Sequence, residues 1–192
     1  MVATFIDHIN SLYPISDTLK ARLEGELEVI TIDKKQHILK EGQRCDYAFF
    51  VMEGLLRVYY VKDDMEVCCR FIHENHIGLS INSFYTRRPG YEYIEALETS
   101  TIARIHHDKL QQLYKEYIEF NYVARIWTEH YASMMEHRSY MLRKQSAEER
   151  YLSFMEKYPM LLQRVPLKYI ATYLGMTLET LSRMRSKVAG SR

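Results

Sequence analysis

The stretch "HILKEGQRCDYAFFVMEGLLRVYY", residues 37–60, decides the fold of this chain because short hydrophobic runs alternate in it with turn residues. Gly42 and Gly54 each follow a glutamate, and the apolar run "YAFFVM" lies between them. Glycine suits tight turns, and runs of about four to eight β-branched, aliphatic and aromatic residues bounded by turns are typical of strands. The stretch therefore predicts strands joined by sharp turns.

The same alternation continues on both sides, from about residue 27 to residue 107. The additional hydrophobic runs are "EVITI", "EVCCRFI", "YEYIEAL" and "STIARI", and the additional turn signals are Lys62-Asp63-Asp64, Gly78 and Pro89-Gly90. Many short strands with regular turns predict an antiparallel sandwich or roll, here a jelly-roll-like double-stranded β-helix. Two short helices are expected before it, at 4–13 and after the capping residue Ser16. We therefore expect an α+β fold that begins with a β-roll domain over residues 1–107.

A single long helix is expected next, over residues 108–144. Apolar residues recur there in alternating steps of three and four from Leu110 to Met141, which is a heptad pattern. We interpret it as a dimerisation helix, and the alternative is that the stripe packs on the chain's own β-domain. The residues expected in the dimer interface are Leu113, Tyr117, Phe120, Ala124, Trp127, Tyr131, Met134, Arg138 and Met141.

Charge is distributed unevenly along the chain, although the net charge is only +1. Residues 160–192 hold six basic side chains against the single acid Glu179, which gives +5. Residues 1–159 hold 20 basic and 24 acidic side chains, which gives −4. A basic segment on an acidic body favours a polyanion as partner, and the alternative is a merely solvated basic tail.

The closing segment, residues 145–192, predicts a helix-turn-helix for binding DNA. The small Ala171 permits close helix approach, Gly175 four residues later permits a left-handed turn, and Thr177 can cap the second helix. After Lys187 only five residues remain, so we expect no full β-hairpin wing. The residues expected to contact DNA are Thr177, Leu178, Glu179, Ser182, Arg183, Arg185, Lys187 and Lys168.

The order of a β-roll, a long helix and a terminal helix-turn-helix resembles the Crp/Fnr family of bacterial transcription regulators. The resemblance rests on residues 37–60 and on "IATYLGMTLETLSRMRSK" (170–187), and "RVPLKYIA" (164–171) makes it especially similar to the short Bacteroidetes-type members. It implies a cyclic-nucleotide-binding-like sensor domain, a cytoplasmic homodimer and sequence-specific binding of double-stranded DNA. RNA polymerase is a further expected partner, a small-molecule effector is possible, and no enzyme activity or membrane association is expected.

The resemblance also implies individual roles in the closing helix. Glu179 and Arg183 stand where the family has an acid and an arginine that read bases, the acid accepting from cytosine and the arginine donating to guanine. Their spacing of four residues places both on one face of a helix. Leu178 departs from the family pattern, because many members have another base-reading arginine there.

The effector site departs further from the members that bind cyclic nucleotides. Those members use a Gly-Glu pair for the ribose and an Arg-Ser pair for the phosphate, whereas this chain has Leu79 at the acidic position and no serine after Arg88. We therefore expect weak or no binding of cAMP and an unknown effector. The residues expected around the effector are Gly78, Leu79, Ser80, Arg88 and Tyr91.

No metal, haem or iron–sulfur cluster is expected. The cysteines are Cys45, Cys68 and Cys69, none of them near the N-terminus, where the iron–sulfur members of the family carry theirs. His73 and His76 are three residues apart, a weak metal signal in a strand. Two alternatives stay open: a cupin-like metal-binding enzyme, and a ligand-sensing protein-interaction module that binds no DNA. The operator, the regulated genes and the direction of regulation do not follow from the sequence.

Overall fold

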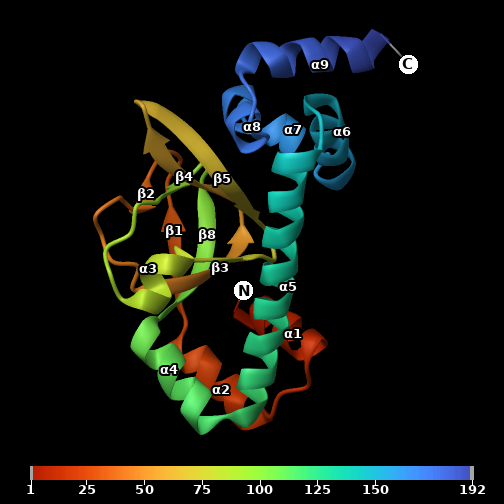
Figure 1. Ribbon diagram of the computed structural model, residues 1–192. Coiled ribbons are helices and arrows are strands. Elements are labelled where there is room, and N and C mark those ends of the chain that lie inside the picture. Colours follow the sequence, from red (N-terminus) through yellow and green to blue (C-terminus); the bar gives the residue numbers. More distant parts are fainter. Residues whose placement is uncertain (1, 191–192) are drawn as a thin grey trace. The chain divides into compact units, whose positions relative to one another are not determined.

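The computed structural model describes residues 2–190 and divides into two compact units (Figure 1). Unit 1 comprises the chain up to Tyr60 together with Arg70–Glu129. Unit 2 comprises Val61–Cys69 and the chain from His130 onward. This division differs from the predicted boundaries after residues 107 and 144. Residues 108–144 do not form a separate unit, because the part up to Glu129 belongs to unit 1 and the part from His130 belongs to unit 2.

Two antiparallel sheets form the β-roll, which confirms the predicted fold class. The first sheet has the order β1 (Glu28–Ile32), β8 (Ser100–His106), β3 (Tyr47–Glu53), β6 (Ile77–Gly78). The second has the order β2 (His37–Leu39), β7 (Tyr93–Ala96), β4 (Leu55–Lys62), β5 (Met65–His73). Non-consecutive strands are neighbours in both sheets, so the pairing is that of a roll and not of a simple meander.

The hydrophobic run of β3 is continuous because both of its faces are covered. Phe49 points between the sheets, where it lines a cavity together with Ile94 and Ile102. Phe50 points to the opposite face, as alternate residues of a strand do. There its ring lies 4.7 Å from the ring of Phe5 on helix α1 (Val2–Leu12). Helix α2 (Asp17–Glu26) follows, and the Ser16 side chain caps it by accepting the Leu19 amide, as predicted.

Gly54, in the turn that the opening stretch predicts, has a backbone that only glycine readily adopts. Its φ is +103°, and a Cβ there would lie 2.6 Å from the Cβ of Ser100. The close approach lets the Ser100 hydroxyl accept the Leu55 amide at 3.1 Å. The turn between β3 and β4 is thereby fastened to the start of β8.

The predicted single helix over residues 108–144 is wrong in its first third. The chain forms α4 (His107–Glu116), an extended residue Tyr117, and then α5 (Ile118–Lys144). The Asn121 side-chain amide donates to the carbonyls of Tyr114 and Tyr117, at 2.7 and 3.2 Å. The Asn121 side chain therefore joins the last turn of α4 to the start of α5 across the break. The sequence signal of this break was a single asparagine inside an otherwise regular stripe.

Part of the predicted dimer stripe packs within the single chain, and its role in a dimer stays a prediction. Leu113, Phe120 and Met141 are already buried within the single chain, and Trp127 stacks on Phe5 at 6.1 Å. Arg138 donates to a backbone carbonyl within unit 2. The other stripe residues are half-buried, and they are Tyr117, Ala124, Tyr131 and Met134.

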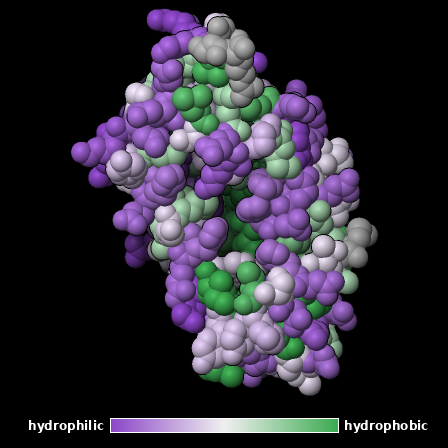
Figure 2. All heavy atoms as spheres, turned by 90° about the vertical axis from the view of Figure 1, so that its right-hand side faces the viewer, coloured by the Kyte–Doolittle hydropathy of each residue, from purple (hydrophilic) through white to green (hydrophobic). Residues whose placement is uncertain are grey.

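On the face drawn in Figure 2, surface hydrophobic side chains form separate groups among hydrophilic ones.

Unit 2 is mainly helical, with α6 (Ala147–Lys157), α7 (Leu161–Arg164), α8 (Leu167–Tyr173) and α9 (Leu178–Gly190). A capping box begins α6: Glu149 N donates to the Ser146 hydroxyl at 3.2 Å, and Ser146 N donates to the Glu149 carboxylate at 2.7 Å. The fully buried apolar side chains of these helices form the core of the unit, and they are Phe154, Leu161, Ile170, Ala171, Leu174 and Leu181. Within residues 2–190, no helix has the length and apolar character needed to cross a membrane.

Candidate nucleic-acid interface and sensor pocket

The turn between α8 and α9 is closed by two backbone hydrogen bonds around a left-handed glycine. Gly175 has φ +64°. Its amide donates to the Thr172 carbonyl at 3.1 Å, and the Met176 amide donates to the Ala171 carbonyl at 3.0 Å. This pair of bonds is the Schellman arrangement that ends helices at a glycine. The predicted left-handed turn at Gly175 between two helices is therefore present in the structure.

Helix α9 begins with a side-chain cap. The Thr177 hydroxyl accepts the Thr180 amide at 3.2 Å, as predicted. Hydrogen bonds from its own backbone amide and from Thr177, followed by the charge of Arg183, lower the pKa of Glu179. Glu179 is therefore a carboxylate at neutral pH, and as such it can only accept hydrogen bonds.

The side chains predicted to contact DNA lie on the solvent-exposed side of unit 2. Leu181 is fully buried and fixes the inward side of α9. The predicted residues are all exposed, and they are Lys168, Thr177, Leu178, Glu179, Ser182, Arg183, Arg185 and Lys187. The structure thus places hydrogen-bond acceptors, guanidinium donors and ammonium groups along α9 and the segment that precedes it.

Lys187 has a partner that the sequence did not indicate. Its ammonium lies 2.5 Å from the Glu148 carboxylate, in the first turn of α6. The exposed fractions of the two side chains are 59% and 37%, so water screens this ion pair. A polyanion that reached Lys187 would therefore have to compete with a carboxylate of the same unit.

Two arginines hold the turn before α9, and sequence reasoning missed both in this role. Arg138 of α5 donates to the Tyr173 carbonyl at 2.9 Å, and its guanidinium lies 4.1 Å from the centre of the Tyr173 ring. Arg150 of α6 donates to the Gly175 carbonyl at 3.4 Å and to the Gln145 carbonyl at 2.7 Å. Cations near the last carbonyls of a helix interact favourably with the negative end of the helix dipole. The turn is thus fixed by two neighbouring helices.

The first two residues of the predicted effector site are engaged inside the roll. A Cβ on Gly78 would lie 2.7 Å from Ile72 Cδ1 and would overlap the ring of Phe49, so only glycine fits there. The Leu79 carbonyl accepts a hydrogen bond from the Arg70 guanidinium at 2.6 Å. Neither residue lines either of the two cavities described below.

Of the other predicted effector residues, Ser80 lies beside a carboxylate. The Ser80 hydroxyl donates to Glu92 at 2.6 Å, and the Arg88 carbonyl accepts the Ser83 hydroxyl at 2.6 Å. The side chains of Arg88 and Tyr91 are exposed. A carboxylate beside Ser80 disfavours an anionic phosphate at this place. These residues therefore do not suit a cyclic nucleotide, and weak or no cAMP binding stays a prediction.

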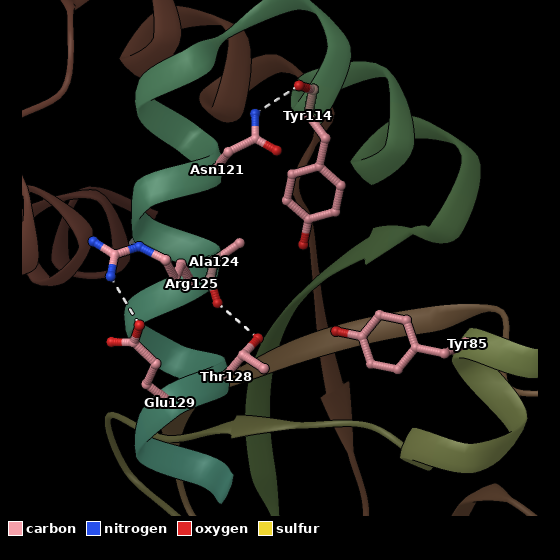
Figure 3. Close-up of a pocket in the computed structure, with 7 residues that line it drawn as sticks. All are labelled: Tyr85, Tyr114, Asn121, Ala124, Arg125, Thr128 and Glu129. Carbon is pink, nitrogen blue, oxygen red and sulfur yellow. Dashed lines mark hydrogen bonds and ion pairs between the residues drawn. The ribbon is translucent and has the colours of Figure 1, made fainter.

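Unit 1 contains two cavities of similar size. One, of about 420 Å³, opens between the two sheets, with Ile38 and Phe49 in its wall and Arg44 and Arg104 among its polar residues. The other, of about 430 Å³, lies between α3 (Ile81–Thr86), α4 and α5 (Figure 3). Its lining residues are Tyr85, Tyr114, Asn121, Ala124, Arg125, Thr128 and Glu129. Sequence reasoning missed both, because each is assembled from elements distant along the chain.

The residues that a metalloenzyme would need are not arranged around a common point. In the described part of the chain, no three or more His, Cys, Asp or Glu side chains are grouped so as to hold a metal ion. The rings of His73 and His76 lie 4.0 Å apart. The three cysteines are free thiols, and burial raises the pKa of Cys45. This geometry gives the cupin-like alternative no support.

Comparison with known proteins identifies the β-roll. Residues 29–117 match the family model of the cyclic nucleotide-binding domain, so this part of the chain is similar to domains of that class. None of the curated proteins matches the sequence significantly. The class agrees with the two-sheet roll that the strands form.

Solved structures extend the similarity to nearly the whole chain. FixK2 from Bradyrhizobium japonicum is 19% identical, with a TM-score of 0.69 over 86% of this chain and 85% of that one. The c-di-GMP-responsive global regulator CLP of Xanthomonas campestris is 12% identical, with a TM-score of 0.74 over 92% and 93%. A CooA variant from Carboxydothermus hydrogenoformans is 18% identical, with a TM-score of 0.67 over 95% and 83%. The chain therefore has the fold of the Crp/Fnr regulators, and the resemblance found in its sequence is confirmed.

Proposed function

We propose that this chain is a sequence-specific DNA-binding transcriptional regulator of the Crp/Fnr type, with α8 and α9 as its helix-turn-helix. One observation carries the proposal: a glycine-closed turn presents α9 with Glu179, Ser182 and Arg183 exposed on a unit of net positive charge. A helix of this kind can lie in the major groove and reach base edges. The fold shared with known regulators supports the same function.

The proposed regulator acts as a homodimer, because two recognition helices read two half-sites of an operator about one helical turn apart. Three residues of the heptad stripe, Leu113, Phe120 and Met141, are already buried within the chain, so we place the dimer contact on the outward side of α5. Exposed apolar side chains there are Ile118, Tyr122 and Tyr140, which are 73%, 42% and 56% exposed. The unit 1 roll is the proposed sensor, with an effector other than cAMP.

A binding titration with Arg183→Ala tests the base-reading role. The preferred DNA site is first obtained by selecting bound genomic fragments with purified protein, and single-base variants of that site are then titrated at several salt concentrations. A bidentate arginine–guanine contact provides roughly 1–3 kcal/mol of discrimination. Arg183→Ala should therefore relax the preference at one base pair of each half-site and leave the other preferences intact.

The matched control is Arg22→Ala, which removes an arginine of α2 in unit 1. It should leave both the preferred site and the salt dependence unchanged. If Arg183→Ala instead weakens all sequences by one common factor, Arg183 contacts phosphate and the proposed reading of bases is wrong. If wild-type protein shows no salt-dependent DNA binding, the proposed function itself is wrong.

A further inference from the structure

The cleft between α3, α4 and α5 presents two phenolic hydroxyls to one space. Figure 3 shows the hydroxyl of Tyr114 hanging between the helices and that of Tyr85 pointing towards α5. Tyr85 is 56% exposed, whereas Tyr114 is half-buried and its ring stacks 5.3 Å from that of Phe120. Two aromatic rings from different elements therefore form the wall of a cleft whose hydroxyls converge.

The remaining polar groups of the cleft offer acceptors and no net charge. Thr128 donates its hydroxyl hydrogen to the Ala124 carbonyl at 2.8 Å, which leaves its oxygen as an acceptor. The Asn121 amide nitrogen is engaged with backbone carbonyls, which leaves its oxygen as an acceptor. Arg125 and Glu129 pair with each other at 2.8 Å at the rim, so their charges cancel.

The phenols stay protonated at neutral pH. Burial raises the pKa of Tyr114, and the nearby Tyr85 raises it further. Burial also raises the pKa of Tyr85. Both hydroxyls can therefore donate hydrogen bonds across the physiological range.

We propose that this cleft binds a neutral, flat organic molecule that carries hydrogen-bond-accepting oxygen atoms. A volume of about 430 Å³ suits a compact molecule of about one or two rings, and the tyrosine rings with the methyl group of Ala124 cover its faces. The phenols donate to its oxygen atoms. A carboxylate or phosphate is disfavoured, because the lining offers no cation without a partner. The proposal names a class of effector for the sensor unit. The biological role of this binding therefore rests on the proposed function as a regulator.

Calorimetric titration of the full-length chain tests the proposal without DNA. The probe is coumarin, a neutral bicyclic lactone with two acceptor oxygens, and the matched probe is coumarin-3-carboxylate, which differs by one charged group. Coumarin should bind in the micromolar to submillimolar range, and the carboxylate at least tenfold more weakly. Tyr85→Phe and Tyr114→Phe remove only the hydroxyls, and each should weaken coumarin binding about 3- to 10-fold. Tyr122→Phe, on the outward side of α5, should not change it.

Filling the cleft provides an independent test. Ala124→Leu places a larger side chain in the cleft and should abolish coumarin binding, whereas Ala132→Leu, at an exposed alanine of the same helix, should not. The absence of coumarin binding at millimolar concentration overturns the proposal, as do equal affinity for the carboxylate and unchanged binding by the two Phe variants. A loss of the dimer on Ala124→Leu would show that a second copy covers the cleft and would also overturn it. Because the readout is ligand binding alone, a failure of DNA binding in the Arg183 experiment remains a separate result.

Discussion

At the scale of single residues, the closing helix combines groups whose roles the sequence indicated and groups whose partners it could not. Gly175, Thr177 and the capping box were predictable, because each acts on backbone a few residues away. The ion pair of Lys187 with Glu148 was not predictable, since it joins residues of different helices. The same is true of Arg138 and Arg150, which converge on one turn from two helices.

Removing the carboxylate beside Lys187 should strengthen DNA binding. Glu148→Gln deletes the acid that competes with phosphate for the ammonium, so affinity for all sequences should rise roughly two- to five-fold. Fluorescence anisotropy at several salt concentrations measures it. The matched control, Glu28→Gln, removes the acid of an ion pair on β1 in unit 1 and should have no effect. Weaker binding by Glu148→Gln would mean that the ion pair positions α9 for DNA.

Replacing Gly175 should destabilise the chain in a residue-specific way. Gly175→Ala forces a Cβ into φ +64°, where it also meets Leu142 Cδ2 at 3.0 Å, and should cost about 1–2 kcal/mol. Gly175→Asn should cost less, because asparagine tolerates the left-handed region. Urea unfolding of the three proteins gives the comparison. Equal stabilities of the Ala and Asn variants would contradict the role of backbone conformation here.

Acid should destabilise unit 1 through His8. Burial, and then the charge of His76, lower the pKa of His8 below its ordinary value of 6.5. The unfolded chain therefore binds this proton more readily, so stability is complete above about pH 6.5 and falls as the pH drops through the lowered pKa. His8→Gln should reduce the loss of melting temperature between pH 7.5 and pH 5. His130→Gln, at an exposed histidine, should retain it.

At the scale of elements, the sequence predicted which helices and strands exist better than it predicted what each of their faces packs against. The strand runs and their turns identified the roll, because alternation and glycine report on local backbone. The heptad stripe correctly indicated helix but not what it faces, since an inward-packed helix and a dimer helix share the same spacing. The break between α4 and α5 at Tyr117 could not be predicted from the hydrophobic pattern. The Asn121 side chain bonds across this break, and the spacing of the apolar residues continues through it unchanged.

At the scale of the whole molecule, the proposed dimer can be tested by variants on the outward face of α5. Light scattering should give a native mass of twice the chain mass of 23.0 kDa. The pair Tyr122→Asp and Tyr140→Asp adds charge to the outward side and should give folded monomers, with only a small loss of thermal stability from the Tyr122 ring that stacks on Tyr13 at 5.0 Å. Trp127→Asp, at a side chain stacked on Phe5, should mainly lower the melting temperature. A double variant that remains fully dimeric at micromolar concentration would contradict this interface.

Unit 2 is assembled from two stretches of chain that the ribosome makes far apart in time. The tip of the β4–β5 hairpin, Val61–Cys69, belongs to it, and the Cys68 amide donates to the Thr172 hydroxyl of α8 at 3.1 Å. During synthesis the hairpin tip is finished long before its helical partners emerge. An excised fragment from residue 130 onward would lack this strand pair. Unit 2, which holds the proposed DNA-binding helices, therefore completes its fold only after α8 has been synthesised, and a fragment from residue 130 onward lacks part of it.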